Sequence, residues 1–166
     1  MSDSTTTDDR KHVAELVKDA KVAMLTTMSS DGKHLSRPMA LQDVEFDGDL
    51  WFFAYEDSAK VEQLRQEPSV NVAFVDDKGH SWTSVAGRAE VVHDRGKAEE
   101  LWTPVLKAWF PDELETPGLT LIKVHADSAE YWEGPTSTVA FAAKNLRAAV
   151  TGNPKSDGVK NDTVEL

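Results

Sequence analysis

Apolar residues recur at two different periods along this chain. In several short segments they alternate with polar residues or form compact runs, as in β-strands that bury one or both faces. These segments are 22–28, 34–46, 50–55, 69–75, 80–93 and, as one strand or two, 119–124 with 129–132. Helical spacing is found instead in 8–20, in a short segment 57–66 before Pro68, and in 94–109. The apolar stripe of the last helix consists of Ala98, Leu101, Val105 and Leu106.

Turn sequences between these segments indicate an antiparallel sheet. Asp31-Gly32, Phe46–Asp49 and the turn at Gly79 each have the composition of a hairpin connection. Pro38 lacks a backbone N–H and indicates an edge strand or a position where that N–H is not needed, and Gly87 indicates a bulge or a bend. We therefore expect a mainly β fold with flanking helices (α+β), in which about six antiparallel strands curl into a barrel.

The length of 166 residues suits one domain with loose ends. Residues 1–7 and 152–166 are polar, and we expect both to be flexible tails. The residues between them, 8–151, are expected to form a single domain, closed by a helix over 137–150.

The net charge of the chain argues against polyanionic partners. It carries 18 Lys and Arg against 29 Asp and Glu, a net charge of −11, and so repels nucleic acids and anionic membrane surfaces. The absence of cysteine excludes disulfides and thiolate zinc sites. We find no apolar stretch of membrane-spanning length and no secretory signal, and we expect a cytoplasmic protein.

Within this acidic chain, one segment has the composition of an anion site. Arg37 lies on a predicted strand, and Ser58 and Lys60 lie where a helix begins. Backbone N–H groups and the positive end of the helix dipole favour a phosphate at such a point. A simpler interpretation is also open: Arg37 pairs with a surface carboxylate, Ser58 is an ordinary cap and Lys60 is solvated.

The aromatic and histidine residues give weaker indications of a binding site. Five tryptophans are many for this length, and they serve either in core packing or in stacking on a planar ring. Trp109 and Trp132 each end an element, where aromatic residues often line a pocket mouth or a subunit contact. The five histidines show no metal-ligand spacing, and nucleotide-binding glycine loops and the G-x-S-x-G motif are absent.

Several motifs together resemble a known family. VAMLTTM, LSRPM, WFFAYEDSAKVEQL, SVNVAFV and HSWTSVAGRAEVV follow one another in the order typical of FMN-binding split-barrel proteins, which are similar to pyridoxamine 5′-phosphate oxidase. WFPDELETPG and AEYWEG resemble the general stress protein branch of that family. The resemblance covers roughly residues 8–135 and rests on the order and spacing of its motifs.

The resemblance implies a six-stranded split barrel that forms a homodimer, with two FMN sites at the dimer interface. In such a site Arg37, Lys60 and Ser58 would hold the phosphate. The residues that would surround the isoalloxazine ring are Pro38 and Met39 on one edge, Phe53, Ala54 and Tyr55 on the other, and Trp109 and Trp132 from the partner chain.

The function is left open among four hypotheses. The leading one is an FMN-binding protein of the general stress type, with oxidoreductase activity in which the flavin accepts hydride. The others are a flavin-binding module for stress or sensing without turnover, a deazaflavin-dependent reductase of the same fold, and a split-barrel dimer without cofactor. The C-terminal sequence GVKNDTVEL lacks the arginine-rich segment of pyridoxamine phosphate oxidases, which argues against that substrate.

Overall fold

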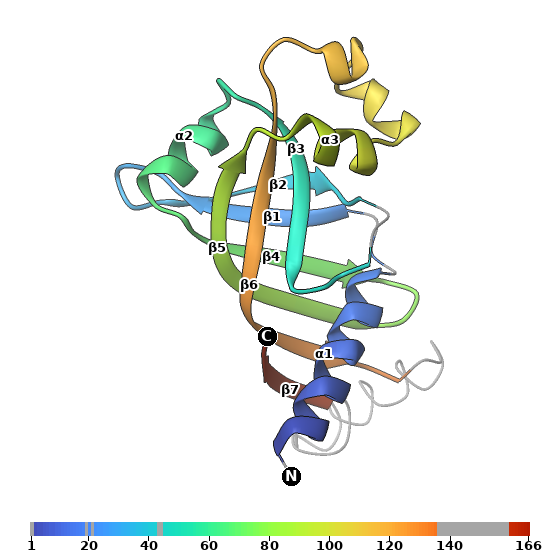
Figure 1. Cartoon of the computed structure of the whole chain (residues 1–166). Helices are drawn as coiled ribbons and strands as arrows, with labels where there is room; N and C mark the ends of the chain where they lie inside the picture. Colours follow the sequence, from blue (N-terminus) through green and yellow to red (C-terminus); the bar gives the residue numbers. More distant parts are fainter. Residues whose placement is uncertain (1, 19, 21, 43–44, 136–159) are drawn as a thin grey trace.

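The computed structural model describes residues 2–18, 20, 22–42, 45–135 and 160–166. Within these residues one antiparallel sheet has the strand order β2-β1-β4-β5-β6-β3, with β7 paired to β6 (Figure 1). The strands are β1 (Val22–Met28), β2 (His34–Ala40), β3 (Asp49–Tyr55), β4 (Ser69–Asp76), β5 (Ser81–Val92), β6 (Leu119–Glu133) and β7 (Lys160–Glu165). The helices are α1 (Ser2–Lys18), α2 (Ala59–Gln66) and α3 (Arg95–Leu101), followed by the 3₁₀ turns Pro104–Ala108 and Glu113–Glu115.

The sheet curls but does not close, because β2 and β3 are the two ends of its path and do not pair. The predicted fold, a mainly β split barrel with flanking helices, is confirmed. Pro38 lies on the edge strand β2, as predicted, where its missing N–H breaks no ladder. β7 is an additional strand that the sequence did not predict.

The turn at Gly48 was predicted to join a hairpin, and that prediction is wrong. The strand expected over 34–46 ends at Ala40, and β3 pairs with β6 rather than with β2. β3 buries both faces: Phe52 lies in the main core, while Phe53 packs in a second cluster beneath α3. Such a strand needs an apolar neighbour, and β6 supplies Ile122 and Leu121 in register.

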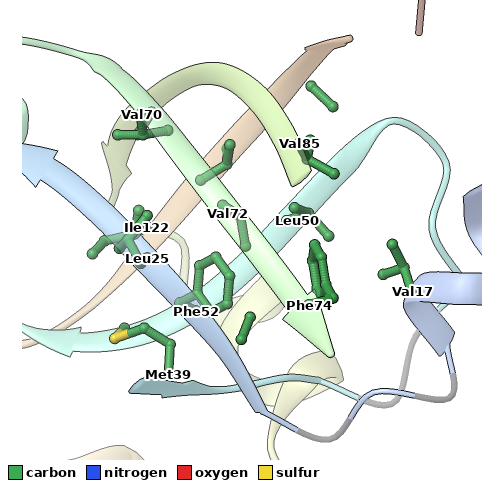
Figure 2. Close-up of a cluster of buried hydrophobic side chains, with 14 of the residues drawn as sticks. Val17, Leu25, Met39, Leu50, Phe52, Val70, Val72, Phe74, Val85 and Ile122 are labelled. Atoms are coloured by element: carbon green, nitrogen blue, oxygen red, sulfur yellow. The ribbon is translucent and has the colours of Figure 1, made fainter. Parts of the chain in front are cut away.

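The main core fills the inside of the curled sheet. Figure 2 shows Leu25, Phe52, Val72, Phe74 and Ile122 converging from β1, β3, β4 and β6, with Val17 of α1 at one end. The core residues of β1 and β4 alternate with less buried neighbours along the strand, whereas β3 and β6 contain runs of consecutive buried residues. The barrel interior is therefore packed with side chains, which leaves the rim and the edge strands to form a binding site.

The helix predicted over 94–109 is interrupted. α3 ends at Leu101, and Thr103 is extended (φ −128°, ψ 147°) before Pro104 begins a 3₁₀ turn. A residue that precedes proline avoids the α conformation, and proline is tolerated only in the first turn of a helix. Ala98, Leu101 and Leu106 are buried as predicted, but Val105 is 64% exposed.

The two ends of the described chain lie together. α1 begins at Ser2, within the segment expected to be a tail, and β7 occupies residues 160–165 of the other expected tail. α1 and β7 lie side by side (Figure 1). His12 of α1 bonds Glu133 of β6 at 2.8 Å, and Lys160 of β7 lies over the Tyr131 ring. The helix predicted over 137–150 lies outside the described residues. No helix in the described part of the chain is long and apolar enough to cross a membrane.

Gly87 sits where β5 shifts register against β6, which confirms the predicted bulge. A Cβ at this position would overlap the carbonyl oxygen of His125 on β6, and a backbone atom cannot move aside as a flexible side chain can.

We predict that Gly87→Ala lowers the free energy of unfolding by about 1–3 kcal/mol, the usual cost of overpacking, as measured by urea denaturation. Gly96→Ala is the matched control, because its Cβ would meet only a side-chain oxygen of Asp94 at 3.4 Å. Its stability should stay equal to wild type or rise. Equal stabilities of Gly87→Ala and wild type would contradict the assigned backbone contact.

Candidate functional site

Arg37 of β2 reaches across the inner rim of the sheet towards β1 and α2. Its Nη1 donates to Thr27 Oγ1 at 2.6 Å and to the Leu25 carbonyl at 3.3 Å, and its Nη2 donates to Gln63 Oε1 at 3.2 Å. All three acceptors are uncharged. Burial lowers the pKa of the guanidinium, but arginine keeps its proton in proteins. Arg37 therefore presents a full positive charge that these hydrogen bonds orient.

Lys60 lies beside this arginine, in the first turn of α2. It is half-buried, and burial followed by the positive charge of Arg37 lowers its pKa. No carboxylate among the described residues forms an ion pair with either cation. The next cation on α2, Arg65, is different, since it pairs with Glu56, which also binds His93 at 2.7 Å. Two adjacent positive charges thus lack a described counter-ion in a chain of net charge −11.

The beginning of α2 adds backbone donors to these charges. Ser58 occupies the N-cap position with an extended backbone, but its side chain does not cap the helix. Its hydroxyl instead donates to the Tyr55 carbonyl at 2.6 Å. The single hydroxyl proton is used in that bond, so the structure does not present Ser58 as the free donor that the sequence suggested. The bond closes the turn after β3, and no side chain caps the first turn of α2, in which the Val61 N–H already bonds the Ser58 carbonyl at 3.0 Å.

The residues expected around a flavin ring lie on the two edge strands that flank the opening of the barrel. Pro38 and Met39 are on β2, and the strand β3 contains Phe53, Ala54 and Tyr55. The side chains of Met39, Phe53 and Ala54 are buried in the two core clusters. A ligand in the opening could therefore contact the backbone atoms of these residues but not their side chains. Edge strands have backbone groups that no neighbouring strand pairs.

The two tryptophans lie in different places. Trp109 is 57% exposed, and its carbonyl accepts a 2.8 Å hydrogen bond from the Tyr55 hydroxyl. The segment around Trp109 is thereby fixed beside the end of β3. Trp132 pairs with Trp82 of β5 and Asn161 of β7, at the end of β6 opposite to the end that pairs with Tyr55. Within one chain these elements do not bring Trp132 to the cation pair.

Sequence reasoning missed Thr27 and Gln63, which join Arg37 in one network. Thr27 is only 1% exposed, and its hydroxyl donates to Gln63 Oε1 at 2.6 Å. Gln63 follows Lys60 by one helical turn, so both lie on the same face of α2. That spacing was a usable signal, whereas the position of Thr27 depends on strand pairing. No group of three His, Asp or Glu suited to a metal ion occurs in the described ranges.

Comparison with known proteins identifies the family. The model of the family described as pyridoxamine 5′-phosphate oxidase like matches residues 8–156. A relative, Protein bli-3 of Neurospora crassa, is 33% identical over 144 residues, which is 81% of this chain and 69% of that protein.

Solved structures show the same fold. A general stress FMN/FAD binding protein from Xanthomonas citri matches with a TM-score of 0.68 at 27% identity, covering 80% of this chain and 93% of the other. A putative general stress protein 26 from Jannaschia sp. CCS1 matches with a TM-score of 0.72 at 22% identity, covering 96% and 99%. The match over most of the sequence, together with the open six-strand path, shows that this chain belongs to the pyridoxamine 5′-phosphate oxidase-like family.

Proposed function

We propose that this chain binds FMN, with the phosphate at Arg37, Lys60 and the beginning of α2. The observation that carries the proposal is the pair of half-buried cations without a described carboxylate partner. A phosphate monoester carries close to two negative charges at neutral pH, which would balance both. Helix N–H groups and charge-assisted hydrogen bonds favour the same ligand.

The ring of the flavin would lie along the opening between β2 and β3. Pro38, Met39, Phe53, Ala54 and Tyr55 would face it mainly through backbone atoms, and Ser58 would fix the turn between the ring site and the phosphate site. A bound flavin supplies hydride or electron transfer, while the protein supplies binding and orientation. We extend the proposal to an FMN-dependent oxidoreductase of the general stress type, without assigning a protein acid or base.

Two alternatives make different demands on the site. A flavin-binding module without turnover needs the same phosphate site but no space for a substrate beside the ring. A deazaflavin coenzyme has a longer, multiply charged tail and needs a longer basic groove. Arg65, the next cation along α2, is already paired with Glu56, which favours FMN over that coenzyme.

The proposed site is completed by a second copy of the chain. Pro38, Met24 and Ala73 are paired across β2, β1 and β4, so their side chains share the outer face of the sheet. Met24 is 40% exposed, and Val22 and Val75 on the same face are also exposed. Pairing continues this face from Val75 through Trp82 to Trp132. An exposed apolar face of this kind is typical of a subunit contact, and we propose that it forms the homodimer.

We predict that Arg37→Ala and Lys60→Ala each weaken FMN binding by about 10- to 100-fold, the loss expected for one charge-assisted contact of about 1.5–3 kcal/mol. Riboflavin, which lacks the phosphate, should bind wild type and both variants equally. Fluorescence titration measures all the affinities, and Lys78→Ala, at the exposed turn before β5, serves as control. Wild-type protein that shows no binding and no thermal stabilisation by FMN would contradict the proposal.

Removal of one charge should stabilise the ligand-free protein. The folded state lowers the pKa of Lys60, so its charged form is disfavoured on folding at every pH where it is protonated. We predict that Lys60→Met raises the free energy of unfolding at pH 7 by about 0.5–1 kcal/mol, a discounted value for a partly solvated group. Denaturation without ligand measures this. A variant less stable than wild type would mean that Lys60 has a stabilising partner.

The proposed homodimer can be tested by a substitution on the exposed sheet face that contains Met24. We predict that Met24→Glu converts the protein to a monomer and weakens FMN binding, because a carboxylate cannot be buried unpaired at an apolar contact. Met24→Leu, which keeps the side chain apolar, should remain dimeric. Size-exclusion chromatography with light scattering measures the mass. A Met24→Glu protein that stays dimeric would exclude this face as the contact.

A further inference from the structure

Gln63 lies at the centre of the contacts that hold Arg37. Its Oε1 atom accepts hydrogen bonds from Thr27 Oγ1 at 2.6 Å and from Arg37 Nη2 at 3.2 Å. Thr27 Oγ1 in turn accepts a bond from Arg37 Nη1 at 2.6 Å. The three side chains form a closed triangle that joins β1, β2 and α2. A guanidinium held at two nitrogens by partners on two other elements has a defined direction.

Arg37 is bound by uncharged side chains, which is unusual for an arginine. A carboxylate is the preferred partner of a guanidinium, and this chain has 29 acidic residues against 18 basic ones. Elsewhere in the described chain carboxylates do pair with arginines, as Glu56 does with Arg65 and Glu99 with Arg95. At position 63 an amide oxygen takes the place that a glutamate oxygen would fill. The amide supplies the acceptor and leaves the positive charge uncancelled.

We infer that Gln63 is a positioning residue for phosphate recognition, with Thr27 as its support: the pair holds the Arg37 guanidinium in place while leaving its charge available to the anion. This inference rests on the proposed function, since the anion is the FMN phosphate. Lys60 and Gln63 share one face of α2, so the helix contributes one charged and one neutral residue to the same site. A glutamate at position 63 would act as an internal competitor of the phosphate.

The Gln63→Glu variant separates this role from a merely structural one. The carboxylate keeps the acceptor for Thr27 and adds an ion pair with Arg37, so the ligand-free melting temperature should be unchanged or higher. FMN affinity should nevertheless fall by at least about tenfold, the loss expected for one charge-assisted contact, while riboflavin affinity stays the same. Affinity and stability then change in opposite directions, or affinity changes alone, which loss of packing would not produce.

The matched control is Gln66→Glu, which makes the same chemical change one turn later on α2. The Gln66 side chain is exposed and bonds Glu62 at 2.8 Å instead of Arg37. We expect its FMN affinity to stay within about twofold of wild type, because a solvated charge outside the site is screened. Thr27 supplies a second test: Thr27→Val, which lacks the hydroxyl, should weaken FMN binding, and Thr27→Ser, which keeps it, should restore wild-type affinity.

The possible outcomes distinguish the two proposals. If wild type binds FMN but Gln63→Glu binds it equally well, the role of Gln63 is wrong and the FMN site stands. If Gln63→Glu loses stability together with affinity for both flavins, Gln63 is structural and the inference also fails. Wild-type protein that binds neither FMN nor riboflavin overturns the proposed function itself. Selective loss of FMN affinity in Gln63→Glu, with Gln66→Glu unaffected, supports the inference.

Discussion

The pairing of β3 with β6 determines where this protein can bind a ligand. Because β3 leaves the neighbourhood of β2 and joins the far side of the sheet, the sheet has two free edges that flank one opening. The interior is filled by the core, so only the rim and these edges remain for recognition. Arg37 lies on one edge strand, and the chain leaves the other through the Ser58 turn into α2, which carries Lys60 and Gln63. One strand pairing therefore brings together residues that are far apart in sequence.

The second constraint is electrostatic. Two positive charges that are partly buried close together oppose folding: burial first, and then the charge of Arg37, lowers the pKa of Lys60. One carboxylate beside Arg37 and Lys60 would relieve their repulsion, and elsewhere the fold does pair arginines with glutamates, at Arg65 and at Arg95. At Arg37 it uses a threonine, a glutamine and a carbonyl instead. Functional sites commonly retain such unfavourable arrangements, because a bound ligand then supplies the missing charge.

Much of this arrangement could be predicted from the sequence, because strands with a period of two and turns rich in glycine have strong local signals. β1 matches its predicted range, Pro38 marks an edge strand and Gly87 marks the bulge. The two wrong predictions, of a continuous helix over 94–109 and of a hairpin at Gly48, have different causes. Pro104 interrupts the apolar stripe predicted as one helix, so α3 ends at Leu101. The partner of β3 depends instead on which distant strand offers apolar residues in register. The adjacency of Arg37 and Lys60 followed from the family resemblance, and the helical spacing of Gln63 after Lys60 was also readable from the sequence. The contact of Arg37 with Thr27 was not, because it depends on the pairing of β1 with β2.

The account makes one central claim: Arg37 and Lys60 together hold the phosphate of FMN, with the ring in the opening between β2 and β3. The most direct measurement is a crystal structure of the protein grown with FMN. The account predicts phosphate oxygens within hydrogen-bond distance of both the Arg37 guanidinium and Lys60 Nζ. A phosphate bound elsewhere, with these two cations still lacking an anionic partner, would contradict it.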